Sequence, residues 1–266
     1  MGQASENGKS KLTVKSIQQM KGKEKIVAIT AYDALWTRMV DPYVDLILVG
    51  DSVGNTVLGY EDTVSVTLEV MKHHAAAAAR AKPQSLLVVD LPFSLAYQSM
   101  DQLLDSCRQL MQIQGVQAIK IEVGDESLFP KIRTLIKAGI PILGHIGLLP
   151  QNINELGNYR SYGNRESGKK RLLDWALALQ DAGCFCVLGE AIKAHTAAEI
   201  TQALNVPFIG IGCGAECDGQ ILVITDVLGM SEYIPGFATV FADLKAPIKK
   251  GMEDYSDSVK AGKFPN

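Results

Sequence analysis

The chain has 266 residues, of which 47% are hydrophobic and 21% charged, and its formal net charge is −3. This length suits one large domain or two small ones, with apolar residues enough for a sizeable core. The weak negative charge argues against a nucleic-acid partner, and no apolar run approaches the roughly 20 residues that a membrane span requires.

Strand-like and helix-like segments alternate along nearly the whole chain. In the first half of the chain we predict strands at 26–30, 46–49, 86–89 and 118–121, and helices at 35–40, 66–81, 100–114 and 127–138. In the second half we predict strands at 141–144, 184–188 and 207–211 and helices at 169–182 and 196–204. Residues 221–225 are predicted to form the eighth strand, with a short helix as the alternative, and a terminal helix is predicted from Lys245. Short runs rich in Val, Ile and Leu are typical of buried parallel strands. This alternation, without a linker-like segment, predicts a single-domain (β/α)8 barrel over residues 1–266.

The cysteines and the N-terminus both favour a cytoplasmic location. The five cysteines contain no C-x-x-C pair and no zinc-site spacing, so we expect free thiols in a reducing compartment. Residues 1–11 lack the apolar core of a secretory signal and are predicted to form a disordered tail.

Three of the predicted strands run into an acidic residue, and these are Asp51, Asp90 and Glu122. The carboxyl ends of parallel strands are where α/β folds bind ligands, so the three carboxylates are expected to converge. Like charges converge stably when a cation joins them, and hard oxygen ligands favour Mg²⁺. The pattern predicts a divalent-metal site at the open end of the barrel. The alternative is that each acid caps the helix after its strand.

Other polar residues stand at the same strand ends. Lys120 precedes Glu122 by two positions, so both side chains share one face of a strand, and its ammonium can offset carboxylate charge. His145 ends the fifth strand and is interpreted as a site residue, with a structural histidine as the alternative. Tyr32 and Asp33 are candidates to lie beside a substrate.

Two further segments were considered for ligand binding. The glycines of 210–214 follow a strand but match a dinucleotide fingerprint only loosely, so we interpret them as allowing close backbone approach to a ligand at the barrel mouth. The long polar segment 151–168 after the fifth strand is predicted to be a lid or a wall of the site.

Six sequence motifs occur together in one order. They are TAYD at 30–33, LVGDSVG at 48–54, DLPF at 90–93, KIE at 120–122, GHIGL with PQ at 144–151, and GIGCG with CDGQIL at 210–222. In this order and at this spacing the chain closely resembles the ketopantoate hydroxymethyltransferase family, from about residue 12 to about residue 260.

The resemblance implies a Mg²⁺-dependent TIM barrel of the phosphoenolpyruvate/pyruvate superfamily. It implies transfer of a hydroxymethyl group from 5,10-methylenetetrahydrofolate to 3-methyl-2-oxobutanoate, through a metal-stabilised enolate. The product is 2-dehydropantoate, on the route to pantothenate and coenzyme A. It also implies a cytoplasmic homo-oligomer, expected to be a homodecamer, with small-molecule substrates and no nucleic-acid or membrane partner.

The family's site residues match particular positions of this sequence. Its metal-binding positions fall on Asp51, Asp90 and Glu122. Its keto-acid positions fall on Asp51, Ser52, Asp90, Lys120 and His145. Its catalytic base, which removes the C3 proton, falls on Glu190. The segment around Glu190 departs from the family's usual Val-Leu-Glu, because Gly189 precedes the acid and the Val-Pro pair that usually follows closely is absent.

Two other functions remain open on this sequence. One is a Mg²⁺-dependent carbon–carbon lyase or a phosphoenolpyruvate mutase-like enzyme, which shares the three acids, although the Lys-Lys-Cys-Gly-His type of loop found in such enzymes is absent. The other is a barrel that has lost catalysis and serves in binding or assembly. The folate is expected to contact the loops after strands five to eight.

Overall fold

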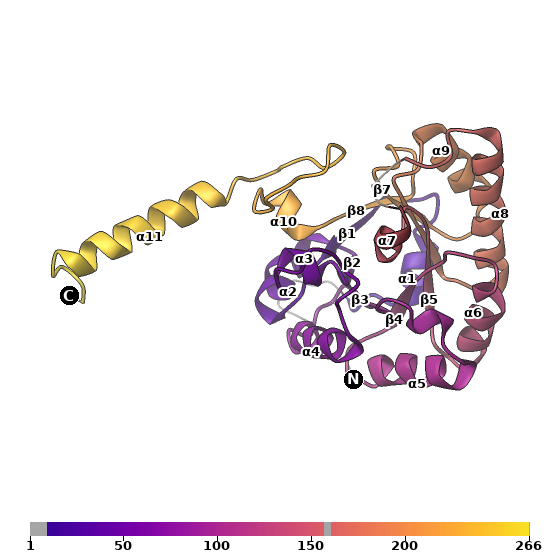
Figure 1. The fold of residues 1–266 in the computed structure, drawn as a ribbon, viewed down its shortest axis with the longest axis horizontal. Helices are drawn as coiled ribbons and strands as arrows, with labels where there is room; N and C mark the ends of the chain where they lie inside the picture. The colour runs from indigo at the N-terminus through magenta and orange to yellow at the C-terminus, as the bar shows by residue number, and fades with distance from the viewer. Residues whose placement is uncertain (1–9, 157–160, 266) are drawn as a thin grey trace. The chain divides into compact units, whose positions relative to one another are not determined.

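The computed structural model describes residues 10–156 and 161–265. In these residues eight parallel strands close into a barrel in sequence order (Figure 1). The strands are β1 (Ile26–Thr30), β2 (Leu46–Val49), β3 (Leu86–Asp90), β4 (Ala118–Glu122), β5 (Ile142–Gly147), β6 (Cys186–Glu190), β7 (Phe208–Ile211) and β8 (Gly219–Leu222). The predicted (β/α)8 barrel is confirmed.

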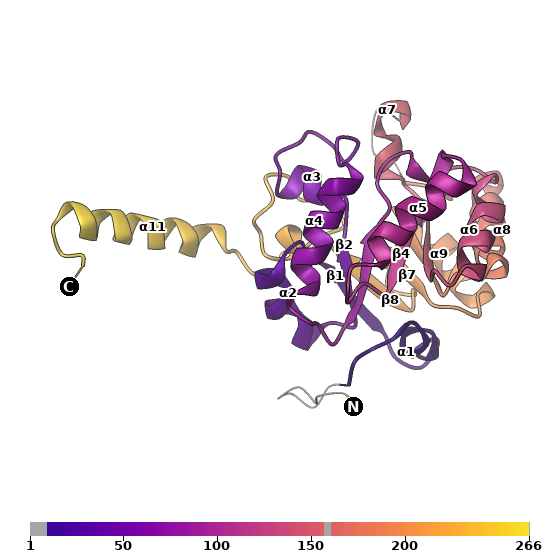
Figure 2. The same ribbon diagram turned by 90° about the horizontal axis from the view of Figure 1, so that it is seen from below.

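Within residues 10–221, the longer helices surround the barrel of strands, as the two ribbon views show (Figures 1 and 2). The α-helices are α1 (Val14–Gln19), α2 (Ala34–Val40), α3 (Val53–Thr56), α4 (Leu68–Ala79), α5 (Met100–Met111), α6 (Leu128–Lys137), α7 (Ile153–Leu156), α8 (Glu166–Ala182), α9 (Ala194–Ala203), α10 (Ile224–Val227) and α11 (Lys245–Lys260). Short 3-10 helices are η1 (Asp41–Tyr43), η2 (Leu95–Tyr97) and η3 (Pro150–Asn152). Because helices and the filled interior enclose both faces of the sheet, most strand residues are buried, as the uninterrupted apolar runs predicted.

Several boundaries differ from those predicted. The sixth strand begins and ends two residues later than expected, so Glu190 is its last residue. The eighth strand, expected at 221–225, begins two residues earlier and ends three residues earlier, at Leu222, and the short helix given as the alternative begins at Ile224 as α10. Helix α1 was not predicted; a reciprocal capping box between Thr13 and Ser16 starts it.

The barrel interior is filled by alternate residues of the strands. These inward residues include Leu46, Leu48, Leu86, Val88, Ala118, Leu143, Cys186, Leu188 and Ile209, and they form one apolar cluster with Ile17 of α1. Because side chains alternate between the two faces of a strand, this series continues toward the carboxyl ends to the predicted polar residues of β3 to β6, namely Asp90, Lys120, Glu122, His145 and Glu190. The two-residue period that places apolar side chains in the core therefore also places a layer of polar side chains at the barrel mouth, which is the end formed by the carboxyl ends of the strands.

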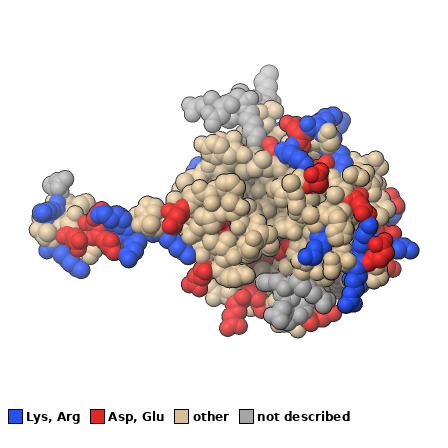
Figure 3. Space-filling view, turned by 90° about the horizontal axis from the view of Figure 1, so that it is seen from above, with Lys and Arg blue, Asp and Glu red and all other residues tan. Residues whose placement is uncertain are grey.

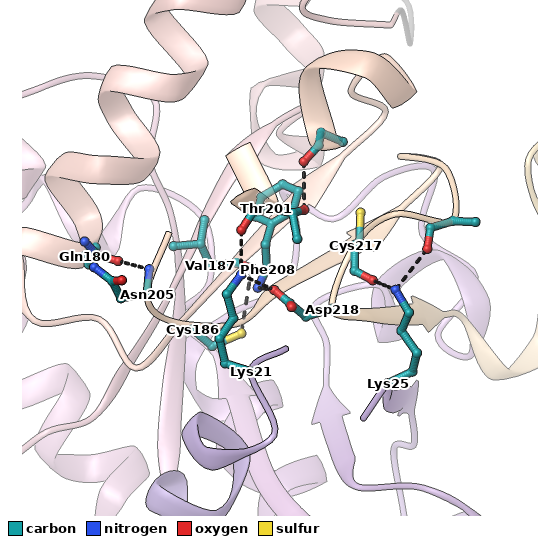
Figure 4. Close-up of polar contacts among 12 residues, drawn as sticks. Lys21, Lys25, Gln180, Cys186, Val187, Thr201, Asn205, Phe208, Cys217 and Asp218 are labelled. Atoms are coloured by element: carbon teal, nitrogen blue, oxygen red, sulfur yellow. Dashed lines mark hydrogen bonds and ion pairs between the residues drawn. The ribbon is translucent and has the colours of Figure 1, made fainter. Parts of the chain in front are cut away.

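The opposite end of the barrel carries a different polar cluster, which we call the foot cluster: Lys21, Thr201, Phe208 and Asp218 (Figure 4). Lys21 Nζ donates to Asp218 Oδ2 at 2.7 Å and to the Thr201 carbonyl at 2.6 Å. The same Asp218 oxygen accepts the Phe208 amide at 2.8 Å. These contacts join the segment before β1 to the starts of β7 and β8, where the barrel closes.

Two glycines make room where elements pack closely. A Cβ on Gly219 would lie 2.5 Å from the Ile26 carbonyl oxygen, so β8 can approach β1 only without a side chain there. A Cβ on Gly210 would lie 2.7 Å from Cys217 Sγ. The expectation that the glycine cluster faces a ligand is therefore wrong for Gly210, because the segment joining β7 to β8 fills that space. All five cysteines are free and buried, as predicted.

The chain divides into two compact units, Met1–Ile221 and Leu222–Asn266. The second unit contains α10 and α11, and α11 confirms the helix expected from Lys245. The predicted tail falls mostly on residues 1–9, outside the described part, whereas Lys11 donates to the carbonyls of Pro83 and Ser85. No helix among the described residues is long and apolar enough to cross a membrane.

Candidate active site

The strand register gathers the predicted polar residues at the carboxyl ends of β2 to β6. Asp90 on β3 pairs in register with Lys120 on β4, and Glu122 pairs with His145 on β5. Asp90, Lys120, Glu122 and His145 are all nearly inaccessible to solvent. Charged groups are rarely buried in this number without a function, since each must be paired or neutralised.

The acids at the strand ends do not cap helices. The helices after β2, β3 and β4 have serines at their N-caps, namely Ser52, Ser99 and Ser127. The capping alternative is therefore wrong for Asp51, Asp90 and Glu122. It holds for Asp33 instead, whose side chain accepts the Trp36 amide at 2.9 Å and starts α2.

Asp51 and Ser52 lie in the turn after β2. The Asp51 amide donates to Asp90 Oδ2 at 3.0 Å, which fixes one acid against the next strand. Ser52 Oγ and the Tyr32 hydroxyl are 2.8 Å apart and share a hydrogen bond, so Tyr32 contacts a predicted substrate-binding residue. Burial raises the pKa of Asp51 well above its usual value, and the charges of Asp90 and Glu122 raise it further.

Lys120 is the central cation of the cluster. Its ammonium forms an ion pair with Asp90 Oδ1, in which both side chains are almost fully buried. Burial alone would lower the pKa of Lys120, but Asp90, Asp51 and Glu122 together raise it above its usual value. Lys120 therefore remains charged, and its charge offsets part of the carboxylate excess.

His145 lies between two glutamates. Its Nδ1 is 3.6 Å from Glu122 Oε1, and its Nε2 is 3.5 Å from Glu190 Oε2. These separations exceed a hydrogen bond, and neither ring nitrogen has a hydrogen-bond partner among the described residues. Burial, helped by the Lys120 charge, lowers the pKa of His145 well below its usual value, so the ring is neutral. It can donate through one nitrogen and accept through the other.

Glu190 ends β6 and is the most accessible acid of the group, with 17% of its side chain exposed. Burial raises its pKa to about 8, and the negative charge of Glu122 adds to this rise. The next residue, Ala191, has φ of 51°, a left-handed conformation unusual for alanine. The Tyr162 backbone N–H donates to the Ala191 carbonyl at 2.8 Å. The segment 151–168, predicted to be a wall of the site, therefore contacts the end of β6. Residues 157–160 of this segment lie outside the described part.

Gln151 is a member of the site that sequence reasoning missed. It lies in η3 and is buried, and its amide group contacts Asp51 while its backbone N–H contacts Glu122. The motif containing Pro150 and Gln151 was recognised, but no local pattern indicates that this turn folds back onto β2. The proline marks only the start of the turn.

A cavity of about 230 Å³ opens beside these residues. It is lined by segments after β3, β4 and β5, including Phe93, Tyr97, Leu149, Gln151 and Glu122. Its walls are mainly apolar and aromatic, with a few polar groups that include Glu122 and Gln151, as in small-molecule sites.

The donor set fits a hard divalent cation in chemistry and charge. Four buried or partly buried carboxyl groups, of Asp51, Asp90, Glu122 and Glu190, face the single ammonium of Lys120 in this cluster, and Glu122 Oε1 has no hydrogen-bond partner among the described residues. Within those residues no three His, Cys, Asp or Glu side chains are already arranged as a metal-binding group. Mg²⁺ commonly takes one or two carboxylates and completes its shell with water and substrate oxygens, so a preformed cage is not required.

Comparison with known proteins identifies the family. The family model of ketopantoate hydroxymethyltransferase matches residues 11–266. The chain belongs to the ketopantoate hydroxymethyltransferase family. The 3-methyl-2-oxobutanoate hydroxymethyltransferase of Trichodesmium erythraeum is 47% identical over 256 residues, covering 96% of this chain and 97% of that protein. The enzyme of that name from Thermosynechococcus vestitus is 46% identical, covering 91% of this chain and 93% of its own length.

Solved structures share the barrel at much lower identity. Phosphoenolpyruvate phosphomutase from Streptomyces platensis has a TM-score of 0.63 at 13% identity, covering 95% of this chain and 89% of that chain. The structure of 2,3-dimethylmalate lyase, a member of the PEP mutase/isocitrate lyase superfamily, has a TM-score of 0.62 at 18% identity, covering 94% and 89%. At such identities the likeness concerns the fold. The predicted TIM-barrel fold and the predicted hydroxymethyltransferase membership are both confirmed.

Proposed function

We propose that this protein transfers the one-carbon unit of 5,10-methylenetetrahydrofolate to 3-methyl-2-oxobutanoate, giving 2-dehydropantoate in pantothenate biosynthesis. The observation that carries the proposal is the set of buried polar residues at the ends of β2 to β6, in a chain of this family. A lyase or mutase activity is disfavoured because relatives at 46–47% identity are named as hydroxymethyltransferases.

Keto-acid binding is assigned to the charged residues of the polar cluster. Lys120 supplies a buried ammonium for the substrate carboxylate, and Ser52 and His145 supply neutral hydrogen-bonding groups. We assign Mg²⁺ to Asp51, Asp90 and Glu122, whose mutual repulsion a divalent cation would relieve. When bound there, the cation supplies Lewis-acid stabilisation of the enolate oxygen.

Glu190 is proposed as the base that takes the C3 proton. A carboxyl with a pKa of about 8 is a stronger base than an ordinary glutamate and still ionises near neutral pH. His145 Nε2 lies 3.5 Å from Glu190 Oε2 and holds no positive charge that would weaken this base. The left-handed Ala191 and its bond to Tyr162 fix the strand end that carries the base.

The remaining steps follow from the overall balance. The C3 proton passes to Glu190, and both C–N bonds of the donor's methylene carbon break: one is replaced by a bond to C3, and the other by a bond to the oxygen of one water. The C3 proton and one water proton end on the two folate nitrogens, and the second water proton stays on the new hydroxyl. Tetrahydrofolate leaves as the second product. The cavity beside Glu122 offers space next to the keto-acid residues during this exchange.

Cellular setting and assembly extend the proposal. Five buried free cysteines suit the reducing cytoplasm.

On α11 the apolar residues Ile248, Met252, Tyr255 and Val259 are exposed at helical spacing, which suits burial against another surface. We therefore propose self-association, with the homodecamer that the resemblance implies. Light scattering of the purified chain measures the mass of the assembly directly.

The chemical proposal is tested by hydrogen exchange at C3. The wild-type protein is incubated with 3-methyl-2-oxobutanoate and Mg²⁺ in D₂O without folate, and deuterium at C3 is followed by NMR. We expect exchange by the wild type, and a decrease of about 10²- to 10⁴-fold in Glu190→Gln, since general-base catalysis typically contributes that much. Glu199→Gln, which alters a surface partner of Lys169, is the matched control and should exchange normally.

The outcomes separate the assignments. A folded wild type that neither exchanges the C3 proton nor forms product with the folate would overturn the function. Exchange by Glu190→Gln at the wild-type rate would leave the function in place and remove Glu190 as the base.

A further inference from the structure

All three N–H donors of Gln151 form hydrogen bonds at the carboxyl ends of neighbouring strands. Its Nε2 donates to Asp51 Oδ2 at 2.7 Å and to the Leu91 carbonyl at 3.0 Å, and its backbone N–H donates to Glu122 Oε2 at 3.2 Å. One residue in η3 after β5 thus contacts the ends of β2, β3 and β4. Residues 51 and 151 are 100 positions apart in the chain, so these bonds are tertiary contacts.

The orientation of the Gln151 amide is determined by its neighbours. Both atoms near its nitrogen are acceptors, one a carboxylate oxygen and one a backbone carbonyl, so only an NH₂ group can face them. The amide therefore holds the Asp51 carboxylate in one direction.

We propose that Gln151 is a positioning residue of this site, which orients Asp51 and Glu122 for the divalent cation and the keto acid. The inference rests on the proposed function and adds a residue to it. Of the two Glu122 oxygens, Oε2 accepts the backbone N–H of Gln151, whereas Oε1 has no hydrogen-bond partner among the described residues. Gln151 thereby fixes one oxygen and leaves the other available to a ligand.

Two substitutions distinguish positioning from simple packing. Gln151→Met keeps the length and shape of the side chain but removes both amide donors. Gln151→Glu keeps the shape and places an acceptor against Asp51 and the Leu91 carbonyl, which repels both. If Gln151 only fills space, the two variants should behave alike; if it orients Asp51, the glutamate should be the worse.

The matched control is Gln117→Met. Gln117, just before β4, is half-buried; its Nε2 donates to the Leu12 carbonyl at 2.9 Å and its Oε1 accepts the Leu87 backbone N–H at 3.4 Å, away from the site residues. Gln117→Met loses both of these side-chain hydrogen bonds without touching the acids. Thermal melting of all variants in EDTA measures the structural cost separately from any effect on the cation.

Binding of Mn²⁺ alone, followed by the electron paramagnetic resonance of the free ion, is the readout. We expect Gln151→Met to weaken Mn²⁺ binding about 10- to 100-fold, as loss of an outer hydrogen-bond partner of metal ligands typically does. Gln151→Glu should weaken binding further than the methionine does, and Gln117→Met should bind as the wild type does.

Each result bears on one claim. If the wild type binds Mn²⁺ and both Gln151→Met and Gln151→Glu bind it equally tightly, the positioning role of Gln151 is overturned. The proposed function still stands in that case. A folded wild type that binds no Mn²⁺ and forms no product would overturn the proposed function itself. Equal weakening by Gln151→Met and Gln117→Met would show that the effect is structural, and this also contradicts the inference.

Discussion

The two polar clusters of the barrel, at its mouth and at its foot, are built from the same kinds of groups in opposite ways. At the foot, Lys21 and Asp218 form an ion pair whose remaining bonds go to backbone groups of the neighbouring segments. At the mouth, Lys120 forms a comparable pair with Asp90, but further carboxyl groups crowd around it, and Glu122 and His145 keep atoms without a hydrogen-bond partner among the described residues.

The difference shows what each cluster contributes. Satisfied polar groups at the start of the strands lower the free energy of the closed barrel, because little is lost on their burial. Polar groups without hydrogen-bond partners and mutually repelling carboxylates at the carboxyl ends raise the free energy of the folded barrel. A bound ligand that pairs with these groups would offset this destabilisation. In barrels of this kind the carboxyl end is where chemistry takes place, whereas the opposite end serves stability.

The largest stability effect is expected from Lys120→Met at the mouth. Removing the ammonium leaves Asp90 buried beside other carboxyl groups, and breaking a buried ion pair typically costs about 3–5 kcal/mol. Urea unfolding at neutral pH measures the change. The double variant Asp90→Asn with Lys120→Met should recover much of the loss, because both charges are then gone. A single variant as stable as the wild type would contradict this account of the mouth.

The mouth should also make stability depend on pH. The pKa of Glu190 is about 8 in the folded protein, against a usual value of 4.5, because burial favours the protonated form. Between these values the unfolded chain has lost the proton while the folded protein retains it, so this group makes stability fall as pH rises from about 4.5 to about 8. Glu190→Gln lacks this contribution. Its melting temperature relative to the wild type should therefore increase from pH 5 to pH 8.5 in EDTA, and a constant difference would refute the prediction.

The foot is tested by Asp218→Asn. This change removes the charge that Lys21 faces but keeps an acceptor for the Phe208 amide, so we expect a loss of about 1–3 kcal/mol in unfolding free energy. Product formation per folded molecule should not change, since the foot lies at the other end of the strands. If Asp218→Asn lowered product formation without changing the unfolding free energy, the foot would influence the chemistry. That result would contradict the assignment of stability to the foot and chemistry to the mouth.

The sequence predicts the mouth better than it predicts the foot, for a physical reason. The mouth residues Asp90, Lys120 and Glu122 continue strands whose apolar runs are local signals, so their place follows from the strand period. The foot depends on Lys21 meeting Asp218, which are 197 positions apart, and no local pattern encodes that contact. For the same reason Gln151 was recognised only as part of a motif and not as a partner of Asp51.

The misplaced boundary of β6 has a similar origin. A Cβ at Gly189 would lie 2.3 Å from the Phe208 ring, so the glycine permits β6 to pass its neighbour β7 and to continue as far as Glu190. From sequence alone, a glycine after a short apolar run indicates the end of a strand instead. The departure from the family pattern at this point is thus accommodated by packing against a side chain that the local sequence does not reveal.

The smallest effect is expected from an ion pair in neither cluster. Lys72 on α4 lies 2.8 Å from Glu69, with side chains 31% and 76% exposed. Such surface pairs typically contribute less than about 1 kcal/mol, so Lys72→Met should shift the urea midpoint little, and added salt should reduce even that shift. A loss as large as that of Asp218→Asn would mean that charge pairing alone, irrespective of burial, stabilises this barrel. The expected order, with Lys120→Met above Asp218→Asn and Lys72→Met last, instead makes burial the variable that determines what each ion pair contributes.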